Sequence, residues 1–140
     1  IVRMPGQKPF ITHAITEYID IYPTLAELVK IPAPVNVDGR SFRRVFDDSN
    51  YKHKQVALSQ TARPWPGNKP IKHMGYTIRT DEHRYTQWVN TNNQQVVAEE
   101  LYHTEKDPLE RENIFQSTNE PLLQKMRQYL EQSRVRGNYK

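Results

Sequence analysis

The chain has 140 residues, of which 36% are hydrophobic and 26% are charged, and its mean hydropathy is -0.88. This length allows one domain with a modest core, and the scarcity of apolar residues indicates a piece of a larger protein or a domain that relies on a partner surface. The absence of cysteine excludes a disulfide, a thiolate metal site and a cysteine nucleophile within these residues. The net charge of +4 fits polyanion binding only weakly, because the basic residues are not gathered into runs.

The first third of the chain predicts short helices. Residues 1–4 form an apolar run that we expect to be the end of a buried strand. In residues 15–30, apolar side chains recur at helical spacing, but Pro23 interrupts the pattern. We therefore expect two short helices, with Asp20 near the start of the second. Ser41 is a suitable N-cap for a further short helix.

The middle of the chain predicts a small antiparallel sheet. Residues 55–60 form the first candidate strand. In residues 73–89, apolar and polar side chains alternate on either side of a polar break at residues 80–83, which is typical of a β-hairpin. Residues 96–103 form a further strand after a turn rich in Asn and Gln. No apolar run approaches the roughly 18–20 residues that a membrane-spanning helix needs, and residues 1–6 lack the pattern of a signal peptide.

Residues 121–134 predict an amphipathic helix that ends the fold. Its apolar stripe, which we expect to be core, consists of Leu122, Leu123, Met126, Tyr129 and Leu130. Thr118 or Asn119 would cap the start of this helix, and Gly137 would mark its end. The predicted fold class is α+β: a small antiparallel sheet of about four strands with a C-terminal helix packed on it, preceded by helices.

A loop rich in proline and cations precedes the hairpin and holds the candidate binding residues. These are Arg63, Trp65, Lys69, Lys72 and His73. Cations beside an aromatic ring suit a ligand that carries sulfate or carboxylate groups on a sugar. The alternative is a solvated loop in which Trp65 packs on the core.

The other charged and titratable residues favour structural roles. Glu99 and Glu100 are neighbours on a strand and point to opposite faces, so they cannot act as the paired carboxylates of a glycosidase. Histidines without metal-ligand spacing, expected at the surface or in turns, are His13, His53, His83 and His103. Cations expected on a solvated face are Lys125, Arg127, Arg134 and Arg136.

Five motifs in series resemble the C-terminal portion of type I sulfatases. They are DIYPTL at residues 20–25, VDGRS at 37–41, the strand pair at 74–80 and 84–89, ELY at 100–102, and the DPLE turn at 107–110 with Asn113 after it. The chain departs from the family pattern at His103, where the family has an aspartate. Ser59-Gln60, Arg63-Pro64 and the hairpin are together most similar to the iduronate-2-sulfatase branch.

This resemblance implies how the chain is divided. Residues 1–48 would be the end of the large α/β core, which is alkaline-phosphatase-like, and residues 49–140 the C-terminal α+β subdomain. The candidate loop would face the active-site cleft. The partners implied are the N-terminal sulfatase catalytic domain and a sulfated saccharide substrate, with no nucleic acid and no membrane. A periplasmic, secreted or lysosomal location follows from the resemblance alone.

The resemblance also implies which groups react in the parent enzyme. Such enzymes oxidise a Cys or Ser in a C/S-x-P-x-R motif to formylglycine and bind calcium through Asp and Asn or Gln ligands. This chain has no Cys, none of its serines begins S-x-P-x-R, and Asp47-Asp48 lies in a polar linker. We therefore assign no catalytic residue, no metal ligand and no cofactor to this segment, and expect it to be inactive alone.

Two hypotheses of function follow. In the first, the chain is the C-terminal part of a sulfatase that hydrolyses sulfate esters of an acidic saccharide, and it shapes the substrate pocket. In the second, it is a stand-alone basic α+β module that binds polyanions, either glycan or nucleic acid. A nucleic-acid module would bind with a steep dependence on salt concentration, and the chain has no strand motif of the RNA-binding type.

Overall fold

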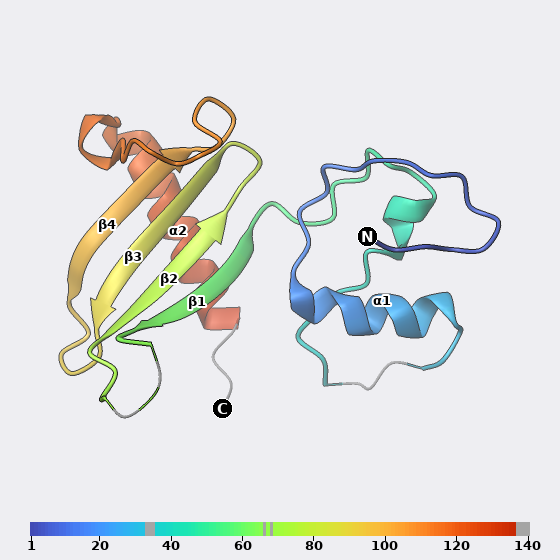
Figure 1. The fold of residues 1–140 in the computed structure, drawn as a ribbon, viewed down its shortest axis with the longest axis horizontal. Coiled ribbons are helices and arrows are strands. Elements are labelled where there is room, and N and C mark those ends of the chain that lie inside the picture. The colour runs from blue at the N-terminus through green and yellow to red at the C-terminus, as the bar shows by residue number, and fades with distance from the viewer. Residues whose placement is uncertain (33–35, 66, 68, 137–140) are drawn as a thin grey trace. The chain divides into compact units, whose positions relative to one another are not determined.

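The computed structural model describes residues 1–32, 36–65, 67 and 69–136. The chain divides into two compact units, Ile1–Lys54 and Gln55–Lys140 (Figure 1). Each unit is described here by itself.

The first unit contains three short helices within its described residues: η1 (Tyr18–Asp20), α1 (Ile21–Leu28) and η2 (Arg43–Phe46). The strand expected at residues 1–4 is wrong, because these residues have no regular secondary structure. The expected pair of helices is present as η1 and α1, but the break falls before Ile21 rather than at Pro23. Pro23 lies in the first turn of α1, where its missing N–H removes no intrahelical hydrogen bond.

Helix α1 ends in a turn that the sequence pattern did not predict. Lys30 has a left-handed backbone with φ of 58°. The N–H of Lys30 donates to the carbonyl of Glu27 at 3.1 Å, and the N–H of Ile31 donates to Ala26 at 2.9 Å. This pair of bonds is a Schellman motif, which satisfies carbonyls at the end of the helix.

A buried carboxylate organises the first unit. The side chain of Asp20 is 0% exposed. Its Oδ1 accepts hydrogen bonds from the N–H of Arg40 at 2.8 Å and from Lys54 Nζ at 2.7 Å. Its Oδ2 accepts one from the N–H of Glu17 at 2.9 Å and lies 3.3 Å from His53 Nε2. Asp20 thus joins the start of α1 to the turn at residues 37–41 and to the end of the unit.

This burial has opposing effects on the pKa of Asp20. Desolvation alone would raise it, but the hydrogen bonds from Lys54 and from the N–H groups of Arg40 and Glu17 outweigh that effect, so the pKa lies below its usual value.

Gly39 allows the turn at residues 37–41 to lie close to η1, because a Cβ at this position would lie 1.9 Å from the carbonyl oxygen of Ile19. The VDGRS turn therefore requires glycine for close contact with η1.

The second unit is a sheet with a helix across one face. Strands β1 (Ala57–Arg63), β2 (His73–Arg79), β3 (His83–Asn90) and β4 (Val96–His103) form an antiparallel sheet in the order β1-β2-β3-β4, and η3 (Phe115–Ser117) precedes α2 (Glu120–Arg136) (Figure 1). The predicted fold class is confirmed. Strand β1 begins two residues later than residue 55 and runs to Arg63, so this candidate site residue lies on the sheet itself.

The core of this unit lies between the sheet and α2. Its buried members are Ile78, Tyr85, Leu101, Leu123, Met126 and Leu130. The predicted apolar stripe of the helix is therefore confirmed as core. Asn119 Oδ1 accepts a hydrogen bond from the N–H of Leu122 at 3.2 Å and caps the helix. Gly137, the predicted end of the helix, lies outside the described residues.

Two cations expected on a solvated face of α2 contact the sheet instead. Arg127 donates from Nε and Nη2 to the two carboxylate oxygens of Glu99, at 3.0 and 3.2 Å. The guanidinium of Arg134 stacks over the ring of Tyr76, with its central carbon 4.0 Å from the ring centroid. Glu99 also accepts a hydrogen bond from the buried hydroxyl of Tyr85. A polar network therefore ties the helix to the sheet beside the apolar core.

The prediction of surface histidines is wrong for His53 and His83, since each is only 8% exposed. His83 faces His103 directly across β3 and β4, with ring centroids 4.7 Å apart. Burial lowers the pKa of His83, and the neighbouring His103 lowers it further. Cross-strand contact of this kind depends on register, which residue spacing along one strand does not reveal.

Candidate functional site

The candidate loop connects β1 to β2 and is fastened at its base. Arg63 and His73 are paired residues at the end of the two strands. The N–H of Lys72 donates to the carbonyl of Arg63 at 3.0 Å. On the other side, Thr91 Oγ1 donates to the carbonyl of Ile71 at 2.9 Å. The sheet thus holds both ends of the loop in place.

The structure brings three of the predicted site residues together. Arg63, Lys72 and His73 meet at the base of the loop, while Trp65 and Lys69 lie along it. Trp65 is 76% exposed. The interpretation in which this ring packs on the core is therefore wrong.

An aromatic side chain beneath Arg63 was missed by the sequence analysis. The central guanidinium carbon of Arg63 lies 4.0 Å from the ring centroid of Trp88. The indole Nε1 of Trp88 donates to Glu100 at 2.8 Å. A Cβ on Gly75 would lie 2.8 Å from this indole ring, so glycine gives the ring its place on the sheet. The strand alternation predicts that Trp88 and Glu100 point to one face, but the stacking with Arg63 depends on pairing across three strands.

This stack holds the guanidinium of Arg63 in one orientation. A cation over an indole face keeps its orientation, and a planar guanidinium can still donate from its edge. Within the described part of the chain, no carboxylate is paired with Arg63. Its charge therefore remains available to a ligand.

Arg84 lies on the same face of the sheet as Trp88, but it is paired with a carboxylate. Arg84 Nε donates to Glu110 Oε2 at 2.7 Å, and its guanidinium lies over Tyr102 at 4.7 Å. The hydrogen bond that Arg84 donates to Glu110 raises the pKa of Arg84 above its usual value. Arg84 is therefore held by Glu110, whereas Arg63 has no carboxylate partner among the described residues.

The described residues provide cations and an exposed aromatic ring at the loop, and they provide neither a metal site nor a membrane-spanning helix. Across the described ranges, no group of three or more His, Asp or Glu side chains is placed to hold a metal ion. Among the same residues, no helix combines the length and apolar character needed to cross a membrane. The loop offers cations and an exposed ring, which together suit a sugar that carries acidic substituents.

Comparisons with known proteins support the sulfatase resemblance. Residues 1–136 match the family described as N-sulphoglucosamine sulphohydrolase, C-terminal. The chain is 31% identical over 140 residues to iduronate 2-sulfatase of Mus musculus, covering 74% of this chain and 25% of that protein. The chain is also 30% identical over 137 residues to iduronate 2-sulfatase of Homo sapiens, and this match covers 72% of this chain and 25% of that protein. The chain therefore spans about a quarter of the length of the curated relatives it matches.

Solved structures share the fold at lower identity. One, determined in complex with its substrate D-glucosamine-2-N,6-O-disulfate, superposes with a TM-score of 0.67 at 21% identity, covering 84% of this chain and 23% of that one. Another has a TM-score of 0.72 at 20% identity and covers 89% of this chain and 28% of that one. Its description concerns the metabolism of multiple glycosaminoglycans by Bacteroides thetaiotaomicron. The predicted resemblance is confirmed: this chain belongs to the C-terminal family of the sulfatases, the one described for N-sulphoglucosamine sulphohydrolase.

Proposed function

We propose that this chain is the C-terminal part of a sulfatase that hydrolyses sulfate esters of an acidic saccharide, in the manner of an iduronate 2-sulfatase. The family match and the two curated relatives support this proposal. Residues 1–48 would complete the large α/β core, and residues 49–140 would form the C-terminal subdomain. The remaining three-quarters of such a protein would be the N-terminal catalytic domain, which is the partner of this chain.

Within this enzyme, the loop between β1 and β2 would contact the saccharide. The observation that carries this proposal is the exposure of Trp65 between cations on a loop whose ends are fixed by the sheet. An indole face can pack on a sugar ring, while Lys69, Lys72 and Arg63 attract its sulfate or carboxylate groups. A loop held at both ends loses less freedom on binding than a flexible one.

The reacting groups would lie outside this chain. In sulfatases of this type, formylglycine supplies the nucleophile and calcium binds the sulfate. The residues here fit neither group: the chain has no Cys, and none of its serines begins S-x-P-x-R. Among the described residues, no group of three or more His, Asp or Glu side chains could hold a metal ion. We therefore derive no chemical step from these residues and propose that they position the substrate.

Steady-state kinetics of the full-length protein test this function. Trp65→Ala, Lys69→Gln and Lys72→Gln should each raise the KM for a sulfated uronate disaccharide by about tenfold, equivalent to ~1.4 kcal/mol. The same variants should leave the hydrolysis of a small aryl sulfate unchanged, because that substrate is too short to reach the loop. Lys106→Gln, which removes a charge from another exposed turn, is the matched control. If no loop variant changes the KM for the disaccharide, the binding role is wrong.

A further inference from the structure

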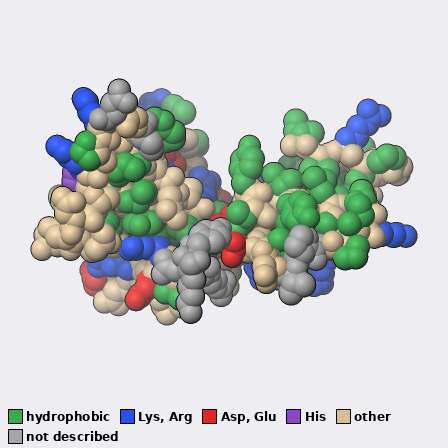
Figure 2. All heavy atoms as spheres, turned by 90° about the horizontal axis from the view of Figure 1, so that it is seen from below, with side chains coloured by type: hydrophobic (Ala, Val, Ile, Leu, Met, Phe, Trp, Pro, Cys, Tyr) green, Lys and Arg blue, Asp and Glu red, His purple; other side chains and the backbone are tan. Residues whose placement is uncertain are grey.

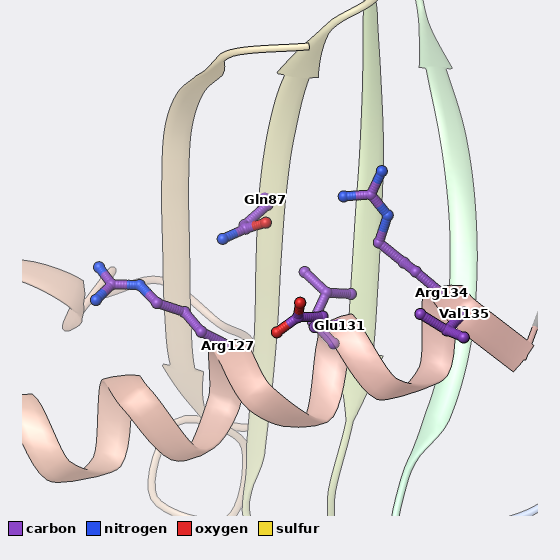
Figure 3. Close-up of a pocket in the computed structure, with 6 residues that line it drawn as sticks. Gln87, Arg127, Glu131, Arg134 and Val135 are labelled. Atoms are coloured by element: carbon purple, nitrogen blue, oxygen red, sulfur yellow. The ribbon is translucent and has the colours of Figure 1, made fainter.

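A pocket lies between α2 and the sheet, away from the candidate loop. Its volume is about 360 Å³, at the small end of the range for ligand sites. It is lined by Gln87, Arg127, Leu130, Glu131, Arg134 and Val135 (Figure 3). Gln87 directly precedes Trp88 on β3, so its side chain points to the opposite face of the sheet and toward α2, whereas Trp88 and Arg63 lie on the other face. The pocket is therefore distinct from the loop.

The two arginines of the pocket differ in their hydrogen-bond partners among the described residues. Arg127 is occupied, because it bonds to Glu99 through two nitrogens and to Glu120 Oε1 at 3.1 Å. Arg134 stacks on Tyr76, but no acceptor for its N–H groups occurs among residues 1–32, 36–65, 67 and 69–136. The stack fixes the plane of this guanidinium while its edge stays free to donate. Arg134 is the cation that can take an anionic group.

The orientation of Gln87 provides a hydrogen-bond acceptor in the same pocket. Its Nε2 donates to the hydroxyl of Tyr85 at 2.9 Å and lies 3.3 Å from Glu99 Oε1. These partners turn the amide nitrogen toward the side of Arg127, so the amide oxygen points to the side of Arg134, as Figure 3 shows. The carboxylate of Glu131 enters the same space from α2 and adds a second acceptor (Figure 3).

This set of groups matches one class of ligand. We propose that the pocket binds one acidic sugar unit, with its carboxylate or sulfate group on Arg134 and its hydroxyls donating to Gln87 Oε1 and Glu131. The exposed Val135 offers apolar surface for the C–H face of the ring, above the buried Leu130. The choice of a saccharide rests on the proposed function. The pocket would be a saccharide site distinct from the loop between β1 and β2.

Ligand binding at this pocket can be measured by methyl NMR of the full-length protein labelled at Leu and Val, because Leu130 and Val135 line the pocket. One probe is a glucuronate disaccharide without sulfate, and the other is glucosamine N-sulfate without a carboxylate. We expect the Leu130 and Val135 signals to shift saturably with at least one probe, and the more effective probe identifies the anionic group. The exposed methyl groups of Leu109 should not move.

Variants separate binding at this pocket from a general effect of charge. Arg134→Gln should weaken the binding at least tenfold, and Arg134→Lys should restore only part of it, since an ammonium lacks the planar fork. Lys125→Gln removes the same charge from an exposed position on the same helix and should have no effect. Val135→Asp leaves the stack on Tyr76 intact, adds a repelling charge at the exposed rim and should also weaken binding, as read at Leu130.

The proposal is overturned if neither probe shifts Leu130 and Val135, or if Arg134→Gln binds as well as the parent protein. These outcomes are independent of the proposed function. Sulfate release from a small aryl sulfate tests the enzyme, and the methyl signals report binding whether or not turnover occurs.

Discussion

The two units of this chain are organised by different forces. The second unit has a hydrophobic core of its own, with Ile78, Tyr85 and Leu101 completely buried under α2. In the first unit, the fully buried side chains Asp20 and Thr24 are polar. The first unit therefore combines a buried polar network with a small set of apolar contacts, which includes the buried Ala26 and Val45.

Most of the large apolar side chains around η1 and α1 lie on the surface of the first unit. Figure 2 shows hydrophobic side chains gathered over this unit. The exposed members around η1 and α1 are Tyr18, Ile19, Ile21, Tyr22, Leu25, Val29 and Ile31. A contiguous apolar surface of this kind indicates contact with another protein surface. We attribute it to the N-terminal catalytic domain that the proposed function requires.

The largest effect should come from the buried carboxylate of the first unit. Asp20→Ala should destabilise the full-length protein by about 3–5 kcal/mol, because it removes the acceptor of two backbone N–H groups and one of the two carboxylates that pair with Lys54. Denaturant unfolding measures this change. The control is Asp47→Ala, which removes an exposed i,i+4 pair with Arg43 and should cost less than about 0.5 kcal/mol. Equal losses would contradict the role of Asp20.

The next effect tests the independent core of the second unit. Leu101→Ala should cost about 3 kcal/mol, since it removes a completely buried side chain. Because this core lies within the unit, unfolding of the isolated chain and of the full-length protein should show the same loss. Leu109→Ala, at an exposed position, should be nearly neutral. A loss confined to the full-length protein would mean that the second unit also depends on its partner.

A substitution in the apolar surface of the first unit should destabilise the full-length protein more than the isolated chain. Leu25→Ser should destabilise the full-length protein by about 1.5–3 kcal/mol if the upstream domain buries this side chain. In the isolated chain, where Leu25 is half-exposed at 49%, the loss should be much smaller, and self-association should decrease. Unfolding and sedimentation of the two proteins measure both effects. The same loss in each would show that the surface has no partner.

The smallest expected effect is a loss of folding stability at acid pH. Burial lowers the pKa of His53, and this outweighs the opposing effect of Asp20. The folded state therefore binds fewer protons than the unfolded state, so its stability falls as the pH drops below about 6.5. The pKa of Asp20 is also lowered, so its contribution is lost in a separate window, below about pH 3.9.

Unfolding midpoints measured across both windows check these two slopes. His53→Gln should flatten the dependence in the upper window, while His13→Gln, at an exposed position, should not. An unchanged slope in His53→Gln would assign the acid sensitivity to other groups.

The parts of the fold that depend on local pattern could be predicted from the sequence. Alternation along the hairpin placed β2 and β3, the bounds of β4 agree with residues 96–103, and the apolar stripe of α2 is the core. The loop residues could be proposed because their side-chain chemistry is visible in the sequence.

The remainder depends on contacts between residues far apart in the chain. Nothing near Asp20 indicates that Lys54 and Arg40 would bury it, and helical spacing assigns Arg127 and Arg134 to the polar side of α2. Only the pairing of helix and sheet brings them to Glu99 and Tyr76. The Arg63–Trp88 stack likewise depends on strand register.

Amide hydrogen exchange of the isolated chain and of the full-length protein tests the contrast between the two units most directly. The account predicts equal protection of β2, β3 and α2 in both proteins. It predicts that the amides of α1 are strongly protected only in the full-length protein, where the N-terminal domain covers the apolar surface. Equal protection of α1 in both would contradict the account, because the first unit would then need no partner.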